Sequence, residues 1–228
     1  MRGVSLLPLG FVNMCRAFLA CYILIGAVAS APTQAETIIA EPAMMLVTAT
    51  RYDFVGTNTF AVERWPQGKF LRSTPNLSAT GLYQKVTISA DVLHEVRWHW
   101  SVETLHRTAN LQLKSRDDFG AMIAFVFGEP KWWNRDVPTI AYVWTSTPIP
   151  NGSIQISDRL NNLRYIQLRG TGEVGKLQQE SRNVVADFVR AFGTQPPQLE
   201  YVAVFNDNDQ TKEPASAAFG TIYASRPR

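Results

Sequence analysis

The segments Glu95-Val-Arg-Trp-His-Trp-Ser-Val102 and Ala121-Met-Ile-Ala-Phe-Val-Phe127 decide the fold class of this chain. In the first segment, every second residue from Val96 onward is large and apolar, and the residues between are mostly polar. A period of two is typical of a β-strand with one face in the core and one in water. The second segment is apolar throughout, which predicts a central strand that is buried on both faces.

Further segments repeat this strand composition along the chain. They are rich in β-branched and aromatic residues, and clusters of Pro, Gly, Asn and Asp separate them. The predicted strands are Lys69–Ser73, Gly81–Ser89, Thr139–Ser146, Arg164–Leu168, Glu200–Phe205 and Ala217–Ala224. Many short strands at this spacing predict a mainly β fold, an antiparallel β-sandwich resembling a jelly roll. We assign residues 64–226 to the sandwich and residues 36–63 to an N-terminal extension with the first strand or strands.

One segment has the period of a helix instead. In Leu177–Phe192 the apolar side chains fall near one helical face, and most of the charged ones lie off it. Gly193 follows as a C-terminal cap, and Pro196 and Pro197 prevent the helix from resuming. The sequence therefore predicts one α-helix packed against the sandwich.

The first 35 residues have the pattern of a secretory signal peptide. Arg2 and Arg16 provide a basic start, an uncharged stretch reaches Ala31, and no acidic residue precedes Glu36. Cleavage after Ala35 fits the small-residue rule best. A retained membrane anchor is the alternative, but the uncharged stretch is shorter than the roughly 20 residues of a spanning helix. We expect an exported protein, periplasmic or extracellular, with no stable membrane span after cleavage.

Removal of residues 1–35 changes the bulk properties of the chain. Both cysteines, Cys15 and Cys21, leave with the signal, so the remaining 193 residues cannot form a disulfide. Their 20 basic residues nearly balance 19 acidic ones. A near-neutral chain lacks the basic surface of a nucleic-acid-binding protein, so no nucleic-acid partner is expected.

A glycine-rich segment imitates a nucleotide-binding loop. Gly170, Gly172 and Gly175 satisfy G-x-G-x-x-G, and Lys176 nearly completes a P-loop pattern. Leu177, however, stands where a hydroxyl group must hold Mg²⁺, and the preceding strands have no crossover helices between them. We interpret the segment as a flexible turn and expect no nucleotide.

Two acidic clusters have more than one interpretation. Asp117 and Asp118 precede the central strand, and Asp207 and Asp209 follow a late one. Oxygen ligands two residues apart suit a hard cation such as Ca²⁺. A pair of carboxylates from separate loops could also catalyse hydrolysis across a cleft. The third interpretation is a solvated turn or a structural salt bridge, because Asp and Asn initiate turns.

Trp132 and Trp133 lie in a segment, residues 128–138, that has the composition of a loop. Two adjacent indoles in a polar loop are costly to expose unless they stack on something. They are candidates for a sugar platform or a protein contact, and the alternative is that they fold back onto the sheet.

A set of short motifs resembles domain-of-unknown-function family 3047. The resemblance covers about residues 64–224. In order, the motifs are Leu71-Arg-Ser73, Ser78-Ala-Thr-Gly-Leu-Tyr83, Val96-Arg-Trp-His-Trp100, Asp117-Asp-Phe-Gly-Ala121, Ala141-Tyr-Val-Trp144, Glu180-Ser-Arg182 with Ala186-Asp-Phe188, Ala191-Phe-Gly193 and Asp207-Asn-Asp209. The resemblance implies that the acidic pair, the tryptophan strand and the late Asp-x-Asp are family features, but it implies no activity. At the level of fold, it points to the jelly-roll modules used for carbohydrate binding.

These observations favour an exported, non-catalytic ligand-binding module whose ligand is a glycan or another polar molecule of the cell envelope. The candidate site residues are Trp132, Trp133, Asp117, Asp118, Asp207 and Asp209, with no catalytic residue assigned. Ca²⁺ is the one cofactor considered. A carboxylate-dependent hydrolase and a structural or interaction protein of the envelope remain as alternatives.

Overall fold

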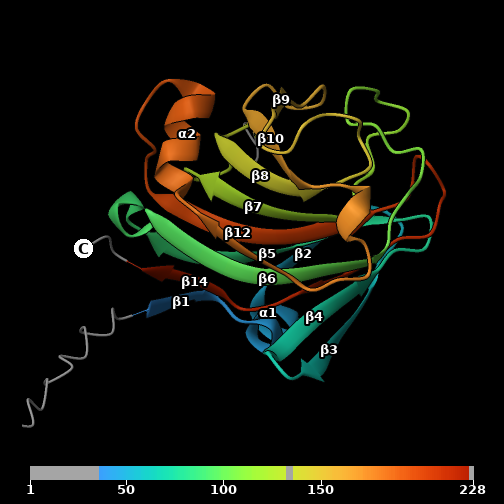
Figure 1. The fold of residues 1–228 in the computed structure, drawn as a ribbon. Helices are drawn as coiled ribbons and strands as arrows, with labels where there is room; N and C mark the ends of the chain where they lie inside the picture. Colours follow the sequence, from blue (N-terminus) through green and yellow to red (C-terminus); the bar gives the residue numbers. More distant parts are fainter. Residues whose placement is uncertain (1–35, 132–135, 226–228) are drawn as a thin grey trace, which may run out of the picture. The chain divides into compact units, whose positions relative to one another are not determined.

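Two seven-stranded β-sheets make up most of the computed structural model, which describes residues 36–131 and 136–225 (Figure 1). In spatial order, the first sheet contains β1 (Glu36–Ala40), β14 (Ile222–Ser225), β6 (Glu95–Thr104), β13 (Ser216–Phe219), β4 (Gly68–Thr74) and β3 (Thr59–Trp65), and β11 (Gln178–Arg182) also pairs with β6. The second contains β2 (Thr50–Val55), β5 (Ala79–Ile88), β12 (Leu199–Asp207), β7 (Ala121–Phe127), β8 (Thr139–Trp144), β10 (Leu163–Arg169) and β9 (Ile154–Ile156). The predicted mainly β fold is confirmed.

The core between the sheets is aromatic. Trp98 and Trp100 of β6 are fully buried, as the alternating pattern predicts. The Trp98 ring lies 5.3 Å from that of Tyr142 on β8, and the Trp100 ring lies 5.7 Å from that of Trp144 on the same strand. Edge-to-face and tilted aromatic contacts at these distances hold the two sheets together across the core.

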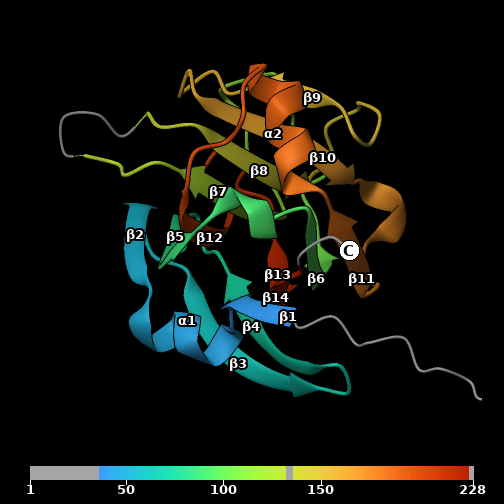
Figure 2. The ribbon, with the colours of Figure 1, turned by 90° about the vertical axis from the view of Figure 1, so that its left-hand side faces the viewer.

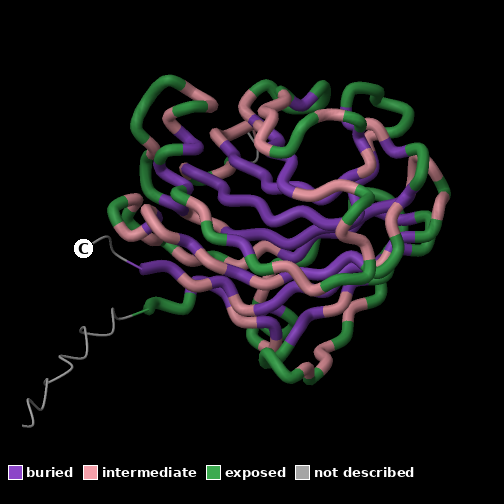
Figure 3. Tube along the Cα trace, in the orientation of Figure 1, coloured by how far each residue is buried: buried purple, intermediate pink, exposed green. Residues whose placement is uncertain are grey.

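Strand β7 lies in the middle of the second sheet and is buried on both faces, as its apolar sequence predicts (Figure 3). Ile123 and Phe125 face the main core between the sheets. Met122 and Ala124 face the other way and belong to a second apolar cluster. We call this second side of the sheet its outer face.

Among the strands of residues 36–131 and 136–225, the pairing is antiparallel with one exception. Strand β10 pairs with β8 in parallel, and Tyr165 lies opposite Ala141. The chain therefore cannot turn back in a tight hairpin between these strands. The intervening segment instead contributes β9, which pairs antiparallel with β10 at the edge of the sheet.

The predicted helix over Leu177–Phe192 is wrong in its first part. Its start is strand β11, and helix α2 runs only from Val184 to Phe192 (Figure 1). The side chain of Asn183 caps α2 by accepting a hydrogen bond from the backbone N–H of Ala186 at 2.9 Å. Pairing of β11 with β6 gives the preceding residues backbone partners that override their helical spacing.

This pairing also places Glu180 beside the core. Its carboxylate accepts a hydrogen bond from Nε1 of Trp100 at 3.0 Å and forms an ion pair with Arg169 at 2.7 Å. The glycine-rich segment before β11 forms a 3₁₀ turn, Thr171–Glu173, and leads into a strand rather than a helix. It therefore lacks the strand-to-helix context of a nucleotide-binding loop.

Two further elements differ from the predictions. The segment Ala217–Ala224 is two strands, β13 and β14, which separate at Gly220, whose N–H donates to the carbonyl of His99 at 2.8 Å. Residues 36–63 contain β1, β2, part of β3 and a second helix, α1 (Pro42–Thr48). Figure 2 shows α1 beside β3 and β4, which it contacts. No helix of residues 36–131 and 136–225 is long and apolar enough to span a membrane.

Candidate functional site

The outer face of the second sheet has a floor of small residues between two tyrosines. Ala203, Ala124 and Ala141 lie side by side on β12, β7 and β8. Tyr83 on β5 pairs with the first of them, and Tyr165 on β10 pairs with the last. With neighbouring strands about 4.8 Å apart, the two tyrosines stand roughly 19 Å apart across the sheet.

The edge of this face next to β2 is aromatic and open to solvent. Tyr52 and Phe54 point to the outer face and are 44% and 60% exposed. The Tyr52 ring lies 5.1 Å from that of Tyr83, and the Phe54 ring lies 5.6 Å from that of Phe205. We call Tyr52, Phe54, Tyr83, Phe205 and the neighbouring Tyr201 of β12 the aromatic platform. Exposure of two adjacent large rings has a free-energy cost in water, so such a surface indicates a binding site.

Gly81 makes this arrangement of rings possible. It lies between Tyr52 on β2 and Phe205 on β12 in the cross-strand register. A Cβ atom at this position would come within 2.7 Å of the Phe205 ring and within 2.7 Å of the Tyr83 ring. Glycine therefore leaves the space in which the two rings lie over β5.

The charged side chains beside the platform are paired with one another. Lys85 bonds the carboxylate of Glu129 at 3.2 Å, and the Tyr201 hydroxyl donates to the same carboxylate at 3.2 Å. At the other end, Arg51 pairs with Asp53 at 2.9 Å. Lys85 and Arg51 thus each have an acidic partner beside the platform.

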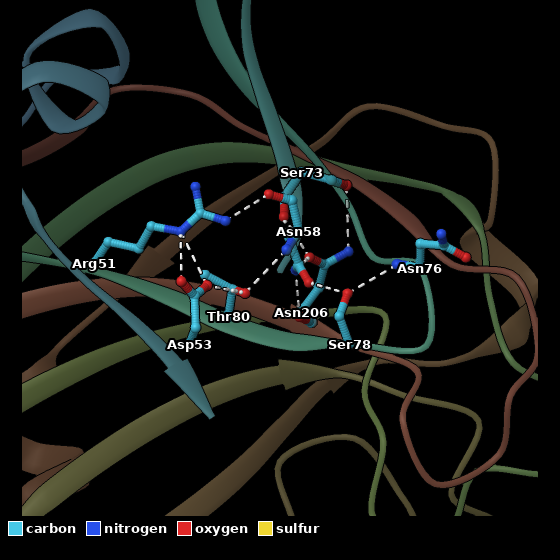
Figure 4. Close-up of polar contacts among 8 residues, drawn as sticks. All are labelled: Arg51, Asp53, Asn58, Ser73, Asn76, Ser78, Thr80 and Asn206. Carbon is cyan, nitrogen blue, oxygen red and sulfur yellow. Dashed lines mark hydrogen bonds and ion pairs between the residues drawn. The ribbon is translucent and has the colours of Figure 1, made fainter. Parts of the chain in front are cut away.

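A buried polar network holds β2 in place (Figure 4). The Asn58 side-chain amide donates to the carbonyl of Asn206 at 2.8 Å and to Ser73 Oγ at 3.2 Å. The Asn58 backbone N–H donates to Thr80 Oγ1 at 3.0 Å, and the Thr80 hydroxyl donates to Asp53 at 2.7 Å. Because Asp53 lies between Tyr52 and Phe54, this network fixes the strand that carries the exposed rings.

Three of the predicted aspartates meet at one end of the outer face. One carboxylate oxygen from each of Asp118, Asp207 and Asp209 lies within 4.8 Å of the others. Asp118 and Asp207 are buried, and Asp209 is half-buried. The Asp207 carboxylate accepts a hydrogen bond from the N–H of Phe119 at 2.8 Å. We call these three residues the aspartate cluster.

Asp118 also connects two loops. Its carboxylate accepts hydrogen bonds from the N–H of Gln210 at 3.2 Å and from both the N–H and the hydroxyl of Thr211 at 2.6 Å. Burial, and then the charge of Asp118, raises the pKa of Asp207 well above its ordinary value. The same two causes raise the pKa of Asp209.

His106 lies against the aspartate cluster. Its side chain is 1% exposed, and neither ring nitrogen has a hydrogen-bond partner among the described residues. Burial lowers the pKa of this imidazole, while the Asp118 carboxylate and the backbone carbonyl of Asp207 act in the opposite direction. A buried imidazole without a partner is uncommon in a folded protein.

The other predicted site residues are placed differently. The carboxylate of Asp117 is bound by Arg159, with oxygen-to-nitrogen distances of 2.5 and 2.7 Å, and it is not one of the three carboxylates that lie within 4.8 Å of one another. Trp132 and Trp133 lie outside the described residues. The platform residues Tyr52 and Phe54 were not predicted, although Tyr52-Asp-Phe54 has the alternation of a strand with one aromatic face.

The sequence matches the model of the family described as "Protein of unknown function (DUF3047)" over residues 50–223, most of the chain. The chain belongs to this family. The match also confirms the resemblance based on the short motifs. A comparison with curated proteins finds no match.

Several solved structures have a distantly similar fold. The family 11 carbohydrate-binding module of the cellulosomal cellulase Lic26A-Cel5E of Clostridium thermocellum has a TM-score of 0.41 at 9% identity, over 86% of this chain and 96% of that module. The family 11 xylanase of Neocallimastix patriciarum has a TM-score of 0.32 at 8% identity, over 84% and 96%. The enzymatically active domain of tailspike protein 4 of bacteriophage CBA120 has a TM-score of 0.40 at 10% identity, over 79% and 20%. At these values the similarity carries no argument about the function of this DUF3047 protein.

Proposed function

We propose that the chain is a non-catalytic module that binds a glycan on the aromatic platform. The observation that carries the proposal is the exposure of Tyr52 and Phe54 on β2, in ring contact with Tyr83 and Phe205. The apolar faces of sugar rings stack on such side chains, and nearby hydroxyl and charged groups supply hydrogen bonds. The Tyr201 hydroxyl and the ion pair of Lys85 with Glu129 are groups of this kind beside the platform.

The pairing of the cations beside the platform supports a neutral sugar as the ligand. Lys85 pairs with Glu129, and Arg51 pairs with Asp53, so each cation beside the platform already has an acidic partner. Binding of an anionic sugar would have to break these pairs and leave a carboxylate beside the ligand. A neutral oligosaccharide can instead accept and donate hydrogen bonds while both pairs remain.

The geometry of the aspartates argues against a glycoside hydrolase. A hydrolase of this type needs two carboxylates that both reach the scissile bond from a cleft. Asp118 is 0% exposed and is already bonded to the backbone of Gln210 and Thr211. A substrate cannot contact this carboxylate without displacing the loop that covers it.

The first test is an array of immobilised plant, fungal and bacterial polysaccharides. The wild-type chain is expected to bind at least one neutral polysaccharide, and the double variant Tyr52→Ala/Phe54→Ala is expected to lose that binding at least tenfold. Both side chains lie at the exposed edge of the sheet, on β2, so their removal should leave the folded structure intact, which circular dichroism checks.

Ile156→Ala is the matched control. Ile156 is 62% exposed on β9, near the opposite edge of the same sheet, so its loss removes apolar surface without touching the platform. The proposal fails if the double variant binds as well as the wild type, or if no neutral polysaccharide is bound.

The same proposal includes export. The pattern of residues 1–35, a basic start followed by an uncharged apolar stretch, supports a location where envelope or extracellular glycans are available.

A further inference from the structure

The aspartate cluster brings acidic groups together from two parts of the chain. Asp207 is the last residue of β12, Asp209 lies just after it, and Asp118 precedes β7. One oxygen of each lies within 4.8 Å of the others. A calcium ion binds carboxylate oxygens at about 2.3–2.6 Å, so two ligands on opposite sides of one ion are roughly 5 Å apart. The separation of the three carboxylates therefore fits a single shared ion.

Repulsion among the three carboxylates of the cluster favours binding of a cation. Three carboxylates at these distances repel one another, and burial of Asp118 and Asp207 removes the water that would screen them. The cation Arg159 is engaged by the neighbouring Asp117 at 2.5 Å. A divalent ion would neutralise the repulsion that burial creates.

His106 is an independent sign that a ligand belongs beside these carboxylates. The imidazole is 1% exposed, lies against Asp118 and the carbonyl of Asp207, and has no hydrogen-bond partner for either nitrogen among the described residues. A water molecule on a cation held by the cluster would give the ring such a partner. Calcium usually keeps water in its shell when protein ligands are few.

We propose that Asp118, Asp207 and Asp209 bind one divalent cation of the calcium type. Three carboxylate ligands are hard oxygen donors, which select calcium over zinc or copper. Magnesium requires near-ideal octahedral geometry at about 2.0–2.1 Å, a demand that carboxylates already fixed by Phe119 and Thr211 do not easily meet. The ion would join the loop that precedes β7 to the loop that follows β12. This inference does not depend on sugar binding.

The test uses the full chain with calcium chloride alone. After dialysis against a chelator, isothermal titration calorimetry is expected to detect one calcium ion per chain. Calcium at about 100 times its Kd should raise the Tm by roughly 5–10 °C, because an ion that binds only the folded state stabilises it by mass action. Magnesium chloride at the same concentration should have a clearly smaller effect.

Asp209→Asn removes one ligand charge at the half-buried position of the cluster, where the substitution keeps the shape of the side chain. Without calcium, this variant should melt above the wild type because one repulsive charge is gone, and calcium should no longer raise its Tm. Asp158→Asn, which neutralises an exposed aspartate outside the cluster, should respond to calcium as the wild type does. The proposal is overturned if calorimetry detects no calcium binding to the wild type, or if Asp209→Asn keeps the full calcium response.

Discussion

Asp187 joins helix α2 to the core through several charged and polar partners. Its carboxylate accepts a hydrogen bond from the Tyr142 hydroxyl at 2.7 Å and pairs with Arg182 at 2.7 Å. Arg190, one turn later on the helix, adds a contact at 3.0 Å from a side chain that is about half exposed. The buried Tyr142 and the half-buried Arg182 should therefore contribute more to stability than the exposed Arg190.

We predict that Asp187→Ala lowers the free energy of unfolding by about 3–5 kcal/mol, because it leaves Arg182 and the Tyr142 hydroxyl without their acceptor. Arg190→Ala should cost less than about 1 kcal/mol, because solvent screens that pair. Urea unfolding at neutral pH measures both. Equal losses for the two variants would contradict this account of the carboxylate.

Two tyrosines of the outer face, the half-buried Tyr83 and the buried Tyr165, give a pH prediction. Burial raises the pKa of Tyr83 and of Tyr165 to about 12, whereas a tyrosine in an unfolded chain ionises near 10. Both groups are neutral in the folded state, so their contribution to stability is complete below pH 10. It decreases as the pH rises from about 10 to about 12, because the unfolded chain gains by ionising first.

The absorbance of tyrosinate checks this prediction. Below about pH 11, the folded wild type, Tyr83→Phe and Tyr165→Phe should show the same number of ionised tyrosines. In denaturant, each variant should show one fewer than the wild type. A smaller amplitude for a folded variant near pH 10 would mean that the replaced tyrosine ionises at its ordinary pKa.

Individual site residues could be predicted from the sequence where the residue type restricts the chemistry of the side chain. The composition of Asp207-Asn-Asp209 and Asp118 indicates oxygen ligands, and the structure brings these aspartates together. The sequence could not separate Asp117 from Asp118, because the partner of Asp117 is Arg159, 42 positions away in the chain. His106 gave no signal, because its environment arises only from contacts between distant segments.

At the scale of elements, Gly81 on β5 decides how the rings of the platform pack. We predict that Gly81→Ala lowers the free energy of unfolding by about 1–3 kcal/mol, because the added methyl group displaces the rings of Tyr83 and Phe205. It should also weaken binding of any sugar that stacks on them. Gly172→Ala is the control, since a Cβ atom there meets no atom within 4 Å. Thermal unfolding of both variants measures the difference, and equal Tm values would refute this role of Gly81.

Strand β11 shows where sequence periodicity fails. The apolar residues of Leu177–Phe192 fit one helical face, yet the chain is extended through Arg182 and becomes helical only at Val184. Backbone pairing with β6 and the burial of Glu180 against Trp100 decide the outcome, and both depend on residues about 80 positions earlier. Asn183 was the available local signal, because an asparagine in extended conformation is a strong N-cap.

At the scale of the whole molecule, the sandwich was predictable because its core strands carry their own pattern. The alternation in β6 predicts a strand with one face in the core, and the apolar run of β7 predicts a strand buried on both faces. Neither prediction needs any other segment of the chain. The order of the strands was not predictable. Pairings such as β12 with β5, or the parallel pair of β10 and β8, are set by how the two sheets close around the aromatic core.

We predict that the protein is exported and that its first 35 residues are removed. When the full chain is produced in a Gram-negative host, the protein should appear in the periplasmic fraction with Glu36 as its first residue, because a signal peptidase cuts after small residues such as Ala35. N-terminal sequencing and mass spectrometry check this. An intact chain in the membrane fraction would show that the N-terminal segment is retained as an anchor.

NMR titration shows whether a neutral sugar lies on the aromatic platform. Hexasaccharides of β-1,4-linked and β-1,3-linked glucose are the first probes, followed by fragments of whichever polysaccharide the array identifies. We predict that the amide and aromatic signals of Tyr52, Phe54, Lys85 and Tyr201 shift on binding, while those of β3 and β4 on the other sheet do not. Sugar-induced shifts confined to other surfaces, or no shifts with any of these sugars, would contradict the account.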